Sequence, residues 1–190
     1  ATGTGKTFVS MGLIDLLKRS NNVKNVLFIA DRIALADQAA EEGFTKFFKE
    51  EPITKLHREN FTTTATLYSS TLQTLMKNKA YKKFSPGFFD LIVFDEAHRS
   101  ILGFKPKELI EYFDAIKVGL TATPRDLEDK STYELFKCED KKPTVEYSYY
   151  DAVDNGTLVL PKTRTIFTKI LTKGLKGDKF SAKDKDKLRR

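Results

Sequence analysis

The stretch Leu91-Ile92-Val93-Phe94-Asp95-Glu96-Ala97-His98 predicts the fold of this chain. Four consecutive large apolar side chains indicate a strand that is buried on both faces, as the strands of parallel sheets are. The two acidic residues that follow lie at the carboxyl end of that strand, where open α/β sheets bind their ligands. We therefore expect an α/β fold with a functional site beside Asp95 and Glu96.

A second motif, Gly3-Thr4-Gly5-Lys6-Thr7, stands near the beginning of the chain. Its small residues allow backbone N–H groups to close around phosphate oxygens, while Lys6 reaches the terminal phosphates and Thr7 can ligate magnesium. Apolar positions over residues 7–17 have helical spacing, so a helix is expected to direct its amino terminus at the phosphates. The predicted nucleotide-binding residues are Gly3, Thr4, Gly5, Lys6 and Thr7.

The two motifs together predict ATP and Mg²⁺ as cofactors. Asp95 and Thr7 are expected to hold hydrated magnesium, and Glu96 to polarise the water that attacks the γ-phosphate. Lys6, Asp95 and Glu96 are therefore the predicted catalytic residues. Each motif also has a simpler interpretation, because Gly-Thr-Gly can be a plain turn and strand ends often carry solvated acids. Their order, followed by a third strand that runs into Thr121-Ala122-Thr123, favours the catalytic interpretation.

Short apolar runs alternate along the chain with segments of helical periodicity. Strands are expected at residues 26–30, 67–70, 91–94 and 117–120, and helices at 7–17, 34–48, 72–76 and 107–113. This alternation predicts a mainly parallel sheet with helices on both faces. We expect residues 1–125 to form this lobe. Residues 126–190 are expected to form a connector with a half-exposed strand at 145–150, a turn at 154–156 and another strand at 163–170.

The start of the chain is expected to be a cut edge. In the full pattern Gly-x-x-x-x-Gly-Lys-Ser/Thr, the first glycine would fall one residue before Ala1. The strand that normally feeds such a loop would then lie further upstream.

Composition narrows the classes of protein. The 15 Phe and 7 Tyr in 190 residues favour globular packing over disorder. The net charge is +7, but residues 173–190 alone contribute +5, so about +2 remains for the rest of the chain. We interpret the basic tail as a solvated charge run in preference to a dedicated nucleic-acid arm. Cys138 is the only cysteine, which excludes an internal disulfide and fits a reducing cytoplasm. No apolar run is long enough to span a membrane.

The motifs resemble those of superfamily-two helicases and translocases of the DEAH type. Ala1-Thr2-Gly3-Thr4-Gly5-Lys6-Thr7 is similar to motif I, Asp95-Glu96-Ala97-His98 to motif II, and Gly119-Leu120-Thr121-Ala122-Thr123-Pro124 to motif III. Ala30-Asp31-Arg32 with Leu35 and Gln38 resembles motif Ia, and Ser70-Thr71-Leu72-Gln73-Thr74-Leu75 a later strand-binding segment. The resemblance implies the first RecA-like P-loop NTPase lobe of a motor.

This resemblance also implies roles for residues outside the phosphate loop. His98, Thr121 and Thr123 would couple the nucleotide state to a DNA-gripping surface, because a neutral imidazole and short hydroxyls can exchange hydrogen bonds without adding net charge. Arg32, Ser70, Thr71 and Gln73 would contact the phosphodiester backbone, which a motor that steps over every sequence requires. A structural histidine is the less favoured interpretation of His98, whereas Arg32 can equally be a helix-start residue paired with a neighbouring acid.

More narrowly, Asp95-Glu96-Ala97-His98-Arg99-Ser100 resembles the motor subunit of type I restriction enzymes. Tyr147-Ser148-Tyr149, Ala152-Val153 and Asn155-Gly156-Thr157-Leu158-Val159 extend this resemblance. That family joins a nuclease domain, two RecA-like lobes and a helical region, and it pumps duplex DNA with ATP. The implied partners are double-stranded DNA and the methylase and specificity subunits.

Two alternatives stay open. A helicase of the repair or type III restriction kind would share motifs I to III, and a nucleotide-gated interaction module would keep the fold without productive turnover. The first lobe alone is expected to hydrolyse little ATP, because in this family the arginine that completes the site comes from the second lobe.

Overall fold

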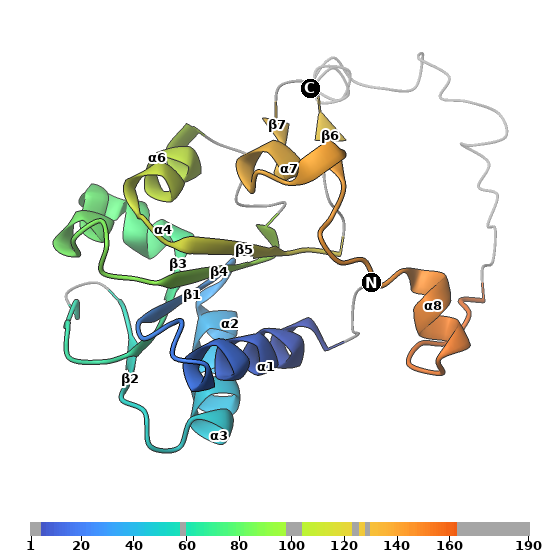
Figure 1. Cartoon of the computed structure of the whole chain (residues 1–190), viewed down its shortest axis with the longest axis horizontal. Coiled ribbons are helices and arrows are strands. Elements are labelled where there is room, and N and C mark those ends of the chain that lie inside the picture. Colours follow the sequence, from blue (N-terminus) through green and yellow to red (C-terminus); the bar gives the residue numbers. More distant parts are fainter. Residues whose placement is uncertain (1–4, 58–59, 98–103, 123–125, 128–129, 163–190) are drawn as a thin grey trace, which may run out of the picture. The chain divides into compact units, whose positions relative to one another are not determined.

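A five-stranded parallel sheet organises the chain (Figure 1). The computed structural model describes residues 5–57, 60–97, 104–122, 126–127 and 130–162. The strand order is β2-β3-β1-β4-β5, and the strands are β1 Val26–Ala30, β2 Ile53–Lys55, β3 Leu67–Thr71, β4 Leu91–Asp95 and β5 Ile116–Leu120. The four predicted strands are confirmed. The sequence analysis did not find β2, a half-buried edge strand of three residues.

Helices cover both faces of the sheet, as predicted (Figure 1). On one face lie α1 Lys6–Arg19, α2 Ile33–Gln38, the π-helical segment η1 Ala39–Phe44 and α3 Thr45–Phe47. On the other face lie α4 Leu72–Met76, the 3₁₀ segment η2 Lys77–Lys83 and α6 Phe104–Tyr112. The helix expected at 34–48 is thus divided into three helical parts, with a π-helical turn in the middle.

Side-chain alternation along the strands divides the core into two layers, because successive strand residues point to opposite faces. In β1, Val26 and Phe28 pack in the layer that contains Met11 and Ile14 of α1. Leu27 and Ile29 of the same strand pack in the layer that contains Leu75, Leu109 and Phe113. Both layers are closed to solvent at β1, β3 and most of β4. This two-sided burial explains why the predictive signal was a continuous apolar run.

The chain divides into two compact units, Ala1–Leu158 and Val159–Arg190. In the first unit, β5 is followed by the antiparallel pair β6 Asp126–Leu127 and β7 Lys130–Ser131, then α7 Thr132–Leu135, the 3₁₀ turn η3 Glu139–Lys141 and α8 Tyr149–Asp154. The predicted boundary between residues 125 and 126 stays a prediction. The strand expected at 163–170 lies outside the described residues.

The half-exposed strand predicted at 145–150 was wrong. Helix α8 begins at Tyr149, because Ser148 and Asp151 form a capping box in which each side chain accepts the other's backbone N–H at 3.0 Å. Val145 is 86% exposed and belongs to no strand. The apolar and polar alternation therefore had no neighbouring strand to pair with. The turn predicted at 154–156 is confirmed, since the Gly156 N–H bonds to the Val153 carbonyl at 2.9 Å.

Among the described residues, no helix combines the length and the apolar character needed to cross a membrane.

Candidate nucleotide-binding site

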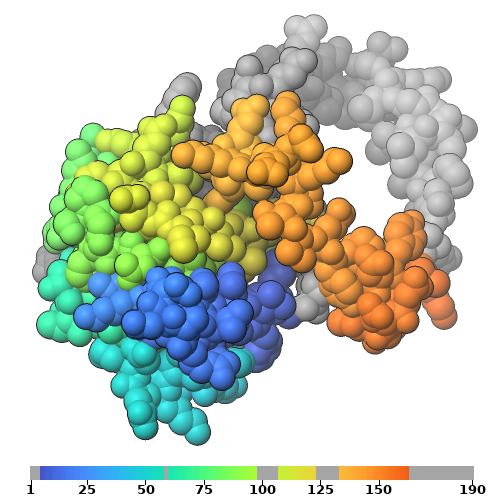
Figure 2. Space-filling model, in the orientation of Figure 1, coloured from blue at the N-terminus to red at the C-terminus, as the bar shows by residue number. Residues whose placement is uncertain are grey.

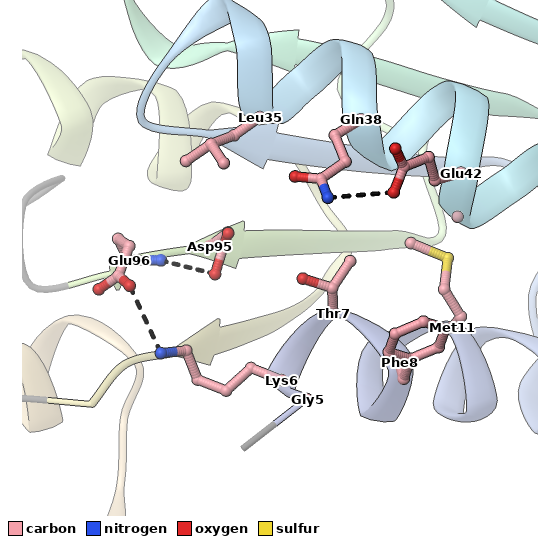
Figure 3. Close-up of a pocket in the computed structure, with 11 residues that line it drawn as sticks. Gly5, Lys6, Thr7, Phe8, Met11, Leu35, Gln38, Glu42, Asp95 and Glu96 are labelled. Atoms are coloured by element: carbon pink, nitrogen blue, oxygen red, sulfur yellow. Dashed lines mark hydrogen bonds and ion pairs between the residues drawn. The ribbon is translucent and has the colours of Figure 1, made fainter. Parts of the chain in front are cut away.

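A pocket of about 300 Å³ opens where the amino end of α1 faces the carboxyl end of β4 (Figure 3). One part of its lining comes from the two motifs that the sequence analysis singled out, namely Gly5, Lys6, Thr7, Asp95 and Glu96. The other part comes from α1, α2 and η1, through Phe8, Met11, Leu35, Gln38, Glu42 and Gly43. The fold thus brings together segments separated by about ninety positions in the chain.

Gly5 allows the loop to turn into α1. Its φ of +81° lies in the left-handed region, which glycine adopts without the steric cost that a Cβ imposes. The Gly5 carbonyl then accepts the Val9 N–H at 3.1 Å, so the helix starts at Lys6. The first N–H groups of α1 are left facing the pocket, and such groups bind anions.

Lys6 and Glu96 form an ion pair across the pocket. Lys6 Nζ lies 3.4 Å from Glu96 Oε1, and the two side chains are only 19% and 25% exposed. The Lys6 ammonium group can instead bind an incoming phosphate, and the ion pair with Glu96 would then be broken. The pair therefore links the residue expected to bind phosphate with the residue expected to act on water.

Asp95 is the last residue of β4, at the end of the sheet where the carboxyl termini of the parallel strands lie, and it pairs with Leu120 of β5. Burial raises the pKa of its carboxyl group, and the neighbouring Glu96 carboxylate raises this pKa further. The Glu96 N–H, which donates to Asp95 Oδ1 at 3.1 Å, and the Lys6 ammonium lower it in part. Burial makes the charged form of this carboxylate less favourable, and a bound cation would offset that cost, which is the property expected of a magnesium ligand.

Glu96 has a strained backbone. Its φ of +50° is uncommon for a residue with a Cβ, and such conformations concentrate at functional sites. The turn at Glu96 carries its side chain away from the strand direction and towards Lys6 (Figure 3). This geometry agrees with a functional role for the acid.

The predicted coupling residues are only partly described. Thr121 follows β5 directly, one residue beyond the Asp95 and Leu120 pair, so it lies at the same sheet edge as Glu96. His98 and Thr123 lie outside the described residues, as do Gly3 and Thr4. Their assigned roles stay predictions.

The predicted DNA contacts lie at the carboxyl ends of β1 and β3 or just after them. Arg32 is 72% exposed and its Nε lies 3.6 Å from the Asp31 carboxylate, and Gln73 is exposed. Ser70 and Thr71, in contrast, are buried. The Ser70 hydroxyl donates to the Leu56 carbonyl at 3.1 Å, and the Thr71 hydroxyl accepts the Thr74 N–H as the cap of α4. The two hydroxyls thus have structural partners, and their contact with DNA stays a prediction.

Six lining residues were not predicted to belong to the nucleotide site, namely Phe8, Met11, Leu35, Gln38, Glu42 and Gly43. Gly43 lies so close to α1 that an added Cβ would be 2.8 Å from Met11 Cε. Glu42 accepts a hydrogen bond from Gln38 Nε2 at 3.1 Å. The sequence signal for this close packing against α1 was Gly43 itself, a glycine inside a segment with helical periodicity.

Comparisons with known proteins agree with this geometry. A family model described as "Type III restriction enzyme, res subunit" matches residues 1–126. The type I restriction enzyme EcoAI endonuclease subunit of Escherichia coli is 34% identical over 165 residues, which cover 83% of this chain and 20% of that protein. The EcoKI endonuclease subunit of E. coli K12 is 28% identical over 188 residues, covering 84% and 15%. The chain thus spans about a fifth or less of these relatives.

Two solved structures share the fold. The Hef helicase domain of Pyrococcus furiosus superposes with a TM-score of 0.60 at 25% identity, covering 73% of this chain and 32% of that one. The SWI2/SNF2 ATPase core of Sulfolobus solfataricus, solved in complex with double-stranded DNA, also gives 0.60 at 19% identity, covering 81% and 32%. These likenesses confirm the predicted RecA-like α/β lobe.

Proposed function

Because the chain belongs to the family of the type III restriction enzyme res subunit, we propose that it is the ATP-binding lobe of a DNA translocase. The observation that carries this proposal is the ion pair between Lys6 and Glu96 at 3.4 Å, in a pocket shared with Thr7 and Asp95. A lysine, a hydroxyl and two carboxylates at the end of a buried strand are the groups that phosphoryl transfer uses.

The residues present fit ATP and Mg²⁺. Among the described residues no group of three or more His, Cys, Asp or Glu could hold a metal by itself. Mg²⁺ does not require such a group, since it keeps several waters and is bound by one or two protein ligands and the substrate phosphates. Thr7 and Asp95 would supply those two ligands, and the bound ion would neutralise charge on the phosphates.

The residues of the site have separate proposed roles in ATP hydrolysis. Lys6 leaves Glu96 and binds the terminal phosphates, where its charge stabilises the developing negative charge. The Glu96 carboxylate then accepts a hydrogen bond from the attacking water and orients it. Thr121, which follows Leu120 at the same end of the sheet, would sense whether the terminal phosphate is present. Gly3, Thr4, His98 and Thr123 complete this assignment by motif.

Double-stranded DNA is the proposed substrate along which the translocase moves. The parallel register pairs Ala30 with Thr71, so the residues that follow each strand, including Arg32 and Gln73, emerge side by side at the sheet edge. Exposed guanidinium and amide groups suit contacts with phosphate oxygens, which carry no sequence information. Ser70 and Thr71 would hold this surface in place through their internal hydrogen bonds.

The relatives favour a type I restriction enzyme over the type III and repair alternatives. Both E. coli relatives are endonuclease subunits of type I enzymes. We therefore assign the chain to the corresponding restriction subunit, which would pump duplex DNA before cleavage together with methylase and specificity subunits in the cytoplasm. Residues 1–125 would be the first motor lobe and residues 126–190 the connector to a second lobe.

DNA-stimulated ATP hydrolysis by the full-length protein tests this function. We expect Glu96→Gln to abolish stimulated turnover while nucleotide binding survives, because the carboxylate acts on water and not on ATP. Glu50→Gln is the matched control, since Glu50 is exposed and lies outside the pocket. Stimulated turnover that persists in Glu96→Gln would contradict the assigned site. If the unmodified protein binds ATP but shows no turnover, the chain belongs to an interaction module.

A further inference from the structure

The pocket extends beyond the groups that phosphate and magnesium would use. Lys6, Asp95 and Glu96 account for its chemistry at one end, whereas Phe8, Met11 and Glu42 lie towards the other end (Figure 3). Phosphoryl transfer has no use for an aromatic ring, a thioether and a third carboxylate. Met11 is a fully buried core residue, so packing accounts for it, whereas the exposed Phe8 and Glu42 call for a separate explanation.

Phe8 is unusual among the lining residues. It directly follows Thr7 in α1, and its side chain is 63% exposed although phenylalanine is normally buried. Its ring lies 5.9 Å from that of Phe47, which is 44% exposed, at an angle of 59°. Helix α1 forms part of the molecular surface beside the segment that follows α2 (Figure 2). An aromatic face is thus available next to the phosphate loop.

We propose that Phe8 forms a stacking platform for the base of the bound nucleoside triphosphate. The inference rests on the proposed function and deepens it. With the terminal phosphate at Lys6 and Glu96, the triphosphate and ribose carry the base towards the far end of the same pocket, where Phe8 lies. Stacking on an aromatic ring binds a base through its π face.

The polar groups at this end suit the edge of a base. Gln38 Nε2 donates to Glu42 Oε2 at 3.1 Å, which fixes the two side chains relative to each other. The Gln38 carbonyl and the second Glu42 carboxylate oxygen can still accept hydrogen bonds. The amino group of a base is the complementary donor. The subsite therefore combines an apolar face from α1 with acceptors from α2 and η1.

The test compares two ligands in the full-length protein, a non-hydrolysable ATP analogue and inorganic tripolyphosphate, both with Mg²⁺. Isothermal titration calorimetry gives the affinities. We expect Phe8→Ala to weaken binding of the ATP analogue by roughly 5- to 150-fold, the range that base stacking on an aromatic side chain supplies. Tripolyphosphate affinity should stay unchanged, because this ligand has no base.

Two further variants separate stacking from disturbance of the loop. Phe8→Tyr keeps an aromatic face and should retain the affinity for the analogue. Val9→Ala is the matched control, because Val9 is 66% exposed on the same helix and lies outside the pocket lining. It should leave both affinities unchanged.

The outcomes are distinguishable. Equal loss of both ligands in Phe8→Ala would show that Phe8 acts through the phosphate loop, which overturns the inference. No loss of the analogue would place the base elsewhere and overturn it as well. If the unmodified protein binds neither ligand, the proposed function itself fails.

Discussion

At the scale of single residues, the environment of Asp95 makes Mg²⁺ binding sensitive to acid. Burial and the Glu96 carboxylate raise the pKa of Asp95, so its charged form is lost at a higher pH than that of an ordinary aspartate. We expect Mg²⁺-dependent nucleotide binding to weaken as the pH falls through this raised pKa. Asp95→Asn should remove the Mg²⁺ dependence at every pH. Titrations with and without Mg²⁺ over a pH series check this, and a binding curve that follows an unshifted aspartate would contradict it.

The same raised pKa predicts an effect of opposite sign on folding. A carboxyl group whose pKa is higher in the folded state stabilises the fold below its unfolded pKa, and this contribution is lost as the pH rises through the folded pKa. At neutral pH the charged Asp95 therefore opposes folding of the nucleotide-free protein. We expect Asp95→Asn to melt at an equal or higher temperature than the unmodified protein at pH 7, measured by calorimetry without nucleotide. A lower melting temperature would show that the charged form is stabilising.

Two buried tyrosines, Tyr68 and Tyr81, allow the contribution of a hydroxyl hydrogen bond to the free energy of unfolding to be compared. The Tyr68 hydroxyl donates to the Ala65 carbonyl at 2.7 Å. The Tyr81 hydroxyl makes no hydrogen bond of acceptable length and angle to the described residues, although it lies near the Glu108 carboxylate. Burial, together with Glu108, raises the pKa of Tyr81 to about 12. We expect Tyr68→Phe to cost about 0.5–1.5 kcal/mol of unfolding free energy and Tyr81→Phe to be neutral or stabilising. Denaturant unfolding measures both, and equal costs would contradict the assignment.

At the scale of elements, two helical glycines are expected to respond oppositely to alanine. Gly12 of α1 has nothing within 4 Å of an added Cβ, so Gly12→Ala should stabilise by about 0.5–1 kcal/mol through the lower entropy of the unfolded chain. In η1, an added Cβ at Gly43 would meet Met11 Cε at 2.8 Å. Met11 Cε is the end of a flexible side chain that can shift, so Gly43→Ala should destabilise by only about 1 kcal/mol, at the low end of the overpacking range. Parallel unfolding curves check both, and a stabilising Gly43→Ala would show that the contact is loose.

Elements were predictable where burial and sequence period agree. The strands β1 and β4 are buried almost throughout, so their apolar runs were sufficient. In β3, which is also buried, only Leu67 and Tyr68 gave an apolar signal, because Ser69, Ser70 and Thr71 are buried polar residues. The strand β2 was missed because Ile53–Lys55 has no such run and depends on pairing with β3. The π-helical turn η1 inside the predicted 34–48 helix was also missed, because the helical spacing of apolar residues does not distinguish an α-helical from a π-helical turn. Residues 145–150 show the converse, since alternation without a neighbouring strand does not make a strand.

At the scale of the whole molecule, the chemical core of the site was predictable from topology. All five main strands are parallel, so their carboxyl ends meet at one edge and bring Asp95 and Thr121 together. Motif order along the chain therefore becomes proximity in space. The wider pocket was not predictable, because Phe8 and Glu42 meet only through the packing of α1 against η1. Sequence periodicity describes each of these helices but not the contact between them.

Bound nucleotide is expected to stabilise the whole lobe against thermal unfolding. A ligand that binds only the folded state stabilises it by RT ln(1 + [L]/Kd), which is about 2.7 kcal/mol at a concentration of 100 Kd. Since the proposed site joins α1 to β4, MgATP should raise the melting temperature of the lobe within the full-length protein. Lys6→Ala should remove this rise by weakening nucleotide binding. The nucleotide-free melting temperature of Lys6→Ala is the baseline for this rise, because the substitution removes one partner of a largely buried ion pair and can itself lower stability. Lys49→Ala, which replaces an exposed lysine outside the pocket, should keep the full rise. An undiminished rise in Lys6→Ala would mean that the nucleotide binds elsewhere.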